Sequence, residues 1–131
     1  MFDLASLVLR LGLGVMFTAH GLQMALGKVG GPGVKGFSQM LSGMGFSQPV
    51  FWAYLAGYTC LLGGLCLIAG IFTRIASVFL IIFMLVAVIK VHLAKGFFIT
   101  NGGYEYNFVI ICALIALLIS GSGKLSIFNK F

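Results

Sequence analysis

Four long apolar stretches take up most of this 131-residue chain. They run from about residue 6 to 26, 50 to 72, 75 to 93 and 106 to 121. A helix rises about 1.5 Å per residue, so roughly 20 residues cross about 30 Å of hydrocarbon, a length that the fourth stretch reaches only marginally. Open strands would leave backbone amides unpaired in lipid. We therefore predict an all-α fold, an integral membrane four-helix bundle that forms a single domain over residues 1–131.

The composition excludes an ordinary soluble domain. Hydrophobic residues make up 61% of the chain and charged residues only 8%, too few to cover a water-exposed surface. The formal net charge of +6 favours contact with anionic lipid headgroups. The basic residues are dispersed rather than clustered, so a nucleic-acid partner is not expected.

Alternating crossings sort the connections onto two membrane faces. Both ends of the chain and the 72–75 connection share one side, here called the terminal face, and the two longer connections share the other, the loop face. The 72–75 connection is so short that the second and third spans form an antiparallel hairpin. Basic residues near the span ends are balanced, so orientation stays open: Arg10, Arg74, Lys124 and Lys130 on the terminal face; Lys28, Lys35, Lys90 and Lys95 on the loop face. We expect Arg10 and Arg74 to contact anionic lipid.

The segment between the first two spans, residues 27–49, is rich in glycine and carries Pro32 and Pro49. Its length without clear periodicity predicts an Ω-like or re-entrant interfacial segment. We expect it to lie over the mouth of the bundle as a lid.

Four polar side chains are predicted to converge near the loop face. His20 lies about 9 Å below that face and Tyr58 about 12 Å below it, while His92 closes the third span and Glu105 opens the fourth. Lys90 is about 200° from His92 around a regular helix, so we expect His92 to point inward and Lys90 to snorkel outward. Ionisable groups inside a membrane generally face a bundle interior, a partner or a water cavity.

These residue types suit a quinone headgroup. An imidazole titrates near neutral pH, a carboxylate can hold the imidazolium, and tyrosines add donors and flat apolar faces. His20, Tyr58, His92 and Glu105 are the candidate quinone-binding residues, and His20 and Glu105 the candidates for proton transfer. The alternatives are structural: His20 satisfies a neighbouring helix, His92 meets headgroups, and Glu105 pairs with Lys90 or Lys95.

The cysteines and glycines point to packing rather than to chemistry. Cys60 and Cys66 are about 9 Å apart along one helix and Cys112 is on another, so buried inert thiols are expected, with a Cys60–Cys112 redox pair as the lesser possibility. The sequence has no close metal-ligand spacing, and a site of the two histidines with Glu105 is the lesser alternative. Small residues in the first and second spans predict a close helix contact: Gly14, Thr18 and Gly21 against Gly57, Gly63, Gly64 and Gly70.

The order of short motifs along nearly the whole chain resembles the DoxX family of small four-helix membrane proteins. The matching residues are Arg10 to Gly14, His20-Gly21, Gly63-Gly64, Gly70 to Arg74, His92, Gly102 to Tyr106 and Gly121 to Ser126. The resemblance implies a prokaryotic cytoplasmic-membrane protein, linked in some members to quinone-dependent sulfur oxidation or to oxidative-stress complexes. Family members often carry an acidic residue just before the paired glycines, where this chain has Cys60, so a carboxylate step is either lost or shifted to Glu105.

Three functions follow as hypotheses. The first is a quinone-associated subunit of a membrane redox complex, which would receive electrons from a partner subunit because the sequence has no evident flavin, haem or cluster motif. The second is a noncatalytic accessory subunit that packs through its glycine faces and stabilises a larger complex. The third is a carrier for a small lipophile. Fold likeness cannot choose among them.

Overall fold

The computed structural model describes residues 2–28, 30–98, 100 and 103–124, and for residues 2, 91, 92 and 94 it describes the backbone only. Helices form the regular structure throughout this part of the chain. In chain order they are α1 (Phe2–Gly21), η1 (Leu22–Leu26), α2 (Gly33–Gly43), α3 (Pro49–Ala69), α4 (Thr73–Ala87), η2 (Val88–His92), η3 (Leu93–Lys95) and α5 (Glu105–Ser120). The prediction of an all-α membrane protein is confirmed.

Three helical segments are long and apolar enough to cross a membrane. They cover Asp3–Leu26, Pro49–Ala69 and Thr73–Lys90, the first and third extended by the π-helical turns η1 and η2. α5 is equally apolar in character but has 16 residues, about 24 Å at helical rise. The fourth span is therefore the short one, as its sequence indicates.

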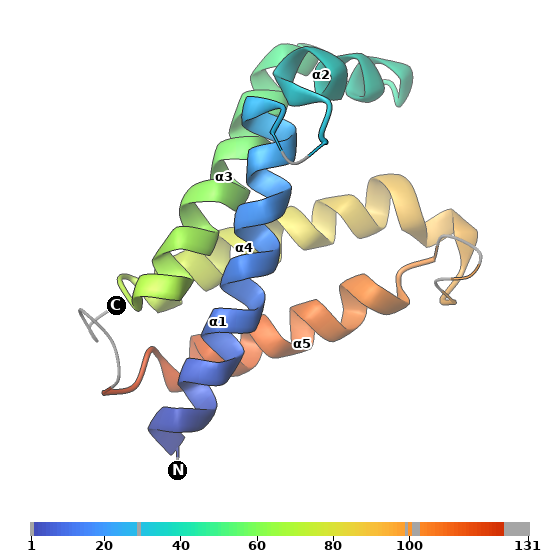
Figure 1. Cartoon of the computed structure of the whole chain (residues 1–131). Helices are drawn as coiled ribbons and strands as arrows, with labels where there is room; N and C mark the ends of the chain where they lie inside the picture. The colour runs from blue at the N-terminus through green and yellow to red at the C-terminus, as the bar shows by residue number, and fades with distance from the viewer. Residues whose placement is uncertain (1, 29, 99, 101–102, 125–131) are drawn as a thin grey trace.

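The four long helices form two pairs. α1 lies along α3, and α4 lies along α5 (Figure 1). The pairs meet at the terminal face, where the short turn after α3 leads into α4, and they lean apart toward the loop face in this view. This divergence leaves space between α3 and α4 that side chains only partly fill.

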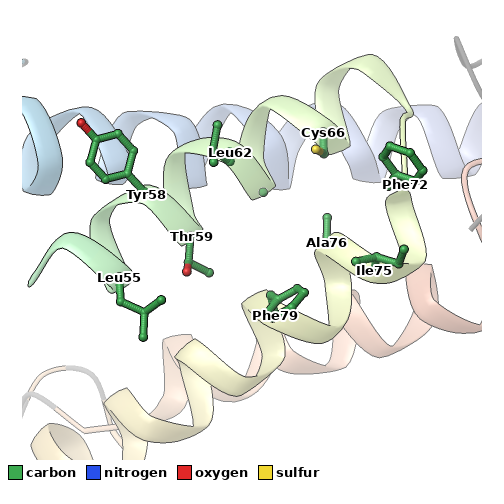
Figure 2. Close-up of a pocket in the computed structure, with 10 residues that line it drawn as sticks. Leu55, Tyr58, Thr59, Leu62, Cys66, Phe72, Ile75, Ala76 and Phe79 are labelled. Atoms are coloured by element: carbon green, nitrogen blue, oxygen red, sulfur yellow. The ribbon is translucent and has the colours of Figure 1, made fainter. Parts of the chain in front are cut away.

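The α3–α4 hairpin turns on a left-handed residue. Gly70 has φ of 74° and its N–H donates to the carbonyl of Cys66, which ends α3. A side chain at such a φ would be strained, so glycine suits the position. The predicted antiparallel hairpin is confirmed, and Figure 2 shows its two helices with side chains from both directed into the space between them.

Glycines bring α1 and α3 into backbone contact. A Cβ added to Gly14 would lie 2.6 Å from Cγ1 of Ile68 and 2.8 Å from the carbonyl oxygen of Gly64. One added to Gly64 would lie 2.5 Å from the backbone nitrogen of Thr18. Both separations are far below van der Waals contact, so only glycine permits this approach. The predicted contact between the two spans is confirmed for Gly14, Gly21, Gly57 and Gly64, whereas Gly63 faces Leu80 of α4 and Gly70 ends α3.

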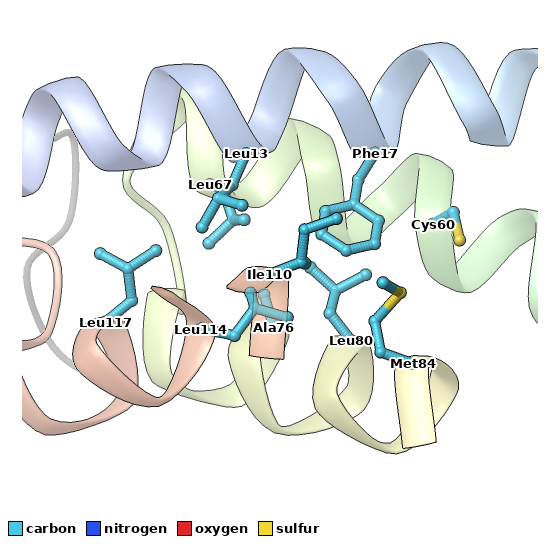
Figure 3. Close-up of a cluster of buried hydrophobic side chains, with 10 residues drawn as sticks. All are labelled: Leu13, Phe17, Cys60, Leu67, Ala76, Leu80, Met84, Ile110, Leu114 and Leu117. Carbon is cyan, nitrogen blue, oxygen red and sulfur yellow. The ribbon is translucent and has the colours of Figure 1, made fainter. Parts of the chain in front are cut away.

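The buried core lies where the two pairs meet (Figure 3). Phe17 of α1 projects toward Ile110 of α5, while Leu80 and Met84 of α4 approach from the other side. Leu80, Leu114 and Leu117 are fully buried. Separating these apolar side chains would cost packing enthalpy even in lipid, where the hydrophobic effect plays no part. The core therefore fixes how one pair sits on the other.

The prediction of an irregular segment over residues 27–49 is wrong at its centre, where α2 forms. Phe37 and Leu41 lie one turn apart and turn toward α3 and η1, while Lys35 and Gln39 are exposed. The surrounding glycines mask this short apolar stripe in the sequence. α2 nevertheless packs across the loop-face ends of the α1–α3 pair (Figure 1), which is the position expected of a lid.

Candidate functional site

Two adjoining pockets form a groove between α3 and α4. The roofed pocket, about 410 Å³, lies near the loop face beneath Phe37 and Leu41 of α2. The hairpin pocket, about 490 Å³, extends toward the α3–α4 turn. Leu55, Thr59 and Phe79 line both, so the two together are here called the α3–α4 groove. From Ile75 to Lys90 the groove follows α4 for about 22 Å, comparable to an extended apolar chain.

The groove is apolar along its length and has a charged end. Lys90 lines the roofed pocket, and its Nζ lies 5.7 Å from the ring centroid of Phe46, within cation–π range. Thr59 contributes a hydroxyl at the junction of the two pockets. Trp52 also lines the roofed pocket. The arrangement suits an amphiphile whose polar head lies near Lys90 and whose chain extends toward the hairpin.

Among the predicted site residues whose side chains the structure describes, Tyr58 alone borders this groove. It lines the hairpin pocket and stacks on Tyr54, with ring centroids 6.2 Å apart and planes 7° apart. Figure 2 shows the side chain of Thr59 between α3 and α4, whereas the Tyr58 hydroxyl points away from α4. Tyr58 therefore supplies an apolar edge, and Thr59 is the hydroxyl that faces the groove.

His20 and Glu105 reach the loop face on neighbouring helices. His20 is exposed in the last turn of α1, and Glu105 is half-buried in the first turn of α5. The Tyr106 hydroxyl donates to Sδ of Met16, so α5 contacts α1 one turn before His20. This contact joins α5 to α1, but neither His20 nor Glu105 lines the α3–α4 groove.

The expectation for Lys90 is wrong, and that for His92 falls beyond the described side chains. Lys90 faces the roofed pocket instead of snorkelling away from the bundle. The prediction turned His92 inward and so placed Lys90 outward, but Lys90 follows Phe79, Phe83 and Val86 at helical spacing and lines the pocket with them. The side chain of His92 lies outside what the structure describes.

The three cysteines are free thiols in different surroundings. Cys60 is fully buried in the core beside Phe17 and Met84, Cys66 borders the hairpin pocket, and Cys112 is exposed on α5. An acidic side chain at position 60 would sit in this apolar core. Within the described residues, no group of three potential metal ligands comes together.

Comparison with known proteins identifies the family. The family model named DoxX matches residues 5–93, which span the first three membrane helices. The chain belongs to the DoxX family. This DoxX protein is also 29% identical over 126 residues to the Bacillus subtilis (strain 168) protein named "Putative oxidoreductase CatD", an alignment that covers 96% of this chain and 86% of that one. No solved structure matches it.

Both arginines of the DoxX chain cap helices. The expectation of contact with lipid headgroups is wrong for Arg10, whose side chain is buried, and stays a prediction for Arg74, which is exposed. The last four carbonyls of a helix lack partners within it, and a cation near them is favoured by the helix dipole. Arg10 of α1 has no exposed surface, and its Nη1 donates to the carbonyl of Leu67 near the end of α3, at 3.2 Å. Arg74 of α4 donates through Nε to Leu118 at 3.2 Å and through Nη2 to Ile119 at 3.5 Å, near the end of α5.

Sequence reasoning missed the groove because its lining looks like the lipid-facing surface. Trp52, Leu55, Ala56 and Thr59 fall at helical spacing on α3, as Phe79, Ile82, Phe83 and Val86 of α4 and Lys90 of η2 do on the following segment. In a soluble protein such stripes would stand out against polar neighbours. In a DoxX helix the opposite faces are apolar as well. The one sequence signal for the groove was Lys90, a charged residue at helical spacing from the apolar stripe on α4.

Proposed function

We propose that this protein is a quinone-binding subunit of a redox complex in a prokaryotic cytoplasmic membrane, and that the α3–α4 groove is its quinone site. The observation that carries the proposal is the groove's combination of length, apolar lining and a polar end. A flat headgroup fits between Trp52 and the apolar residues beneath α2, and an isoprenoid chain fits the hairpin pocket. The likeness to a protein named as an oxidoreductase supports a redox role.

A bound quinone would supply redox chemistry that takes up two electrons and two protons. Lys90 Nζ and the Thr59 hydroxyl are placed to donate hydrogen bonds to headgroup oxygens. The surrounding apolar side chains and lipid would lower the local dielectric and so strengthen those bonds. His20 and Glu105 act at the neighbouring loop-face surface as exchangeable proton groups. The electrons come from a partner subunit, because the chain has no evident redox motif of its own.

The single tryptophan provides a direct binding assay. Trp52 lines the roofed pocket, so a quinone bound there should quench its fluorescence in a saturable way. The protein would be purified in lipid nanodiscs and titrated with a long-chain naphthoquinone. Extraction of the purified protein should also release quinone in about equal molar amount. Release of ordinary phospholipid alone, with quenching that never saturates, would contradict the proposal and favour the accessory-subunit hypothesis.

Filling the groove should abolish this binding. Ala56 is half-buried in the roofed pocket, and Ala56→Phe places a ring where the headgroup would lie. We expect the apparent affinity for quinone to fall at least about tenfold, which corresponds to about 1.4 kcal/mol. Ala116→Phe makes the same change at an exposed position on α5 and should leave affinity unchanged. Equal affinities for the two variants would place the quinone elsewhere.

Proton-transfer residues should be separable from binding residues. Because neither His20 nor Glu105 lines the groove, His20→Ala and Glu105→Gln should keep the affinity measured by Trp52 quenching within about threefold of the original. Both variants should slow quinone-dependent proton uptake by the assembled complex, by about 10²-fold or more for a general acid or base. A tenfold loss of affinity would instead show that His20 and Glu105 belong to the binding site, as the sequence alone predicts.

A further inference from the structure

We propose that the roofed pocket selects quinones whose ring carries an ionised hydroxyl, and that Lys90 is the selecting residue. This inference deepens the proposed quinone site and rests on it. A neutral quinone needs only hydrogen-bond donors, which a hydroxyl such as that of Thr59 supplies. An ammonium group at the same site adds a preference for negative charge.

The charges around the pocket favour an anion. Lys90 is the one charged side chain among the described residues that line the roofed pocket. Within the described part of the chain Lys90 forms no ion pair, and its Nζ lies over the face of the Phe46 ring. The loop-face segments also carry Lys28, Lys35 and Lys95, against the single carboxylate of Glu105. The electrostatic potential at this end of the groove is therefore positive.

The Phe46 contact places the ammonium group at the pocket. The chain between α2 and α3 carries Phe46, and its ring lies against Lys90 on η2, so two separate segments meet at this end of the groove. The attraction of Lys90 to a ring face is weak, of the order of 1 kcal/mol at an exposed site. A charge-assisted hydrogen bond to an anionic oxygen is stronger, so a headgroup anion can use Lys90 without a large penalty.

The experiment compares two ligands that differ in charge at one position. A 2-hydroxy-3-alkyl-1,4-naphthoquinone is anionic at neutral pH, and its 2-methoxy analogue with the same alkyl chain is neutral. Both would be titrated in zwitterionic nanodiscs, with Trp52 quenching as the readout. We expect the original protein to bind the hydroxy compound about tenfold or more tightly than the methoxy compound, the range of one charge-assisted hydrogen bond.

Variants assign the preference to one side chain. Lys90→Met keeps the length of an unbranched side chain and should remove the preference. The affinity for the hydroxy compound should fall about tenfold more than that for the methoxy compound, which loses only a hydrogen bond to a neutral oxygen. Lys90→Arg should retain it, because the charge remains. Lys35→Met is the matched control: Lys35 is exposed on α2 and does not line the pocket, so the preference should persist.

The outcomes separate this inference from the proposed function. Saturable binding of both compounds with equal affinity, or equal weakening of both by Lys90→Met, would overturn anion selection while leaving the quinone site standing. Loss of the preference in Lys35→Met would assign it to the general surface charge and overturn the role of Lys90. Saturable binding of neither compound would overturn both proposals.

Discussion

Gly14→Ala should destabilise the bundle, whereas Gly12→Ala, two residues earlier on the same helix, should not. A methyl group at Gly14 meets Ile68 and the carbonyl of Gly64, while one at Gly12 has nothing within 4 Å. Overpacking of a close contact costs about 1–3 kcal/mol. Replacing an unobstructed helical glycine gains about 0.5–1 kcal/mol from the reduced entropy of the unfolded chain. Unfolding in mixed detergent micelles, followed by Trp52 fluorescence, would measure both variants.

The glycine pair is informative because helix propensity acts on both positions alike. A difference between the two variants therefore reports the α1–α3 contact and nothing about the helix by itself. Gly64→Ala provides a check from the other side of the contact, since its methyl group would meet the backbone of Thr18. If Gly14→Ala and Gly12→Ala change stability equally, α1 and α3 do not make a backbone contact at Gly14.

Arg10→Ala should lower the free energy of unfolding by about 3 kcal/mol or more. The substitution leaves a cavity in place of a fully buried side chain and removes the donor to the Leu67 carbonyl. A lost hydrogen bond to a charged group costs about 1.5–3 kcal/mol, and truncating a large buried side chain adds a packing term. Unfolding under the same micellar conditions would measure the loss.

Two further variants separate packing from capping. Arg10→Met retains much of the volume and should recover the packing part of the loss while leaving the α3 carbonyl uncapped. Arg74→Ala removes the corresponding cap from α5, but Arg74 is exposed, so water and headgroups can replace it and the loss should be about 1 kcal/mol or less. An Arg10→Ala protein as stable as the original would show that the guanidinium does not support α3.

The helices could be predicted from the sequence because length and apolarity decide them in a membrane. The close α1–α3 contact could be predicted as well, since small residues such as Gly14 and Gly64 on one helix face favour a close approach of a second helix. The short helix α2 was harder, because its stripe of Phe37 and Leu41 is set among glycines. Hydrophobic periodicity needs polar neighbours to be visible, and this chain has few.

The site was predicted less well, for a geometric reason. That His20 and Glu105 lie toward one membrane face follows from counting crossings, and the Met16–Tyr106 contact brings α1 and α5 together there. Which side chains enclose a pocket depends instead on the angle between helix pairs, which local sequence does not encode. Lys90 shows the limit clearly, because it shares a face with Phe79, Phe83 and Val86, and the sequence does not show that this face borders a pocket.

The lean between the two helix pairs also determines the route to the groove. Its walls are two helices whose outer faces are apolar, with Leu62, Phe72 and Ile75 exposed beside the hairpin pocket. A long-chain molecule dissolved in the bilayer would thus reach the proposed site sideways between them, without crossing into water. The concentration that would govern occupancy of the proposed site is accordingly the mole fraction of the ligand in the lipid.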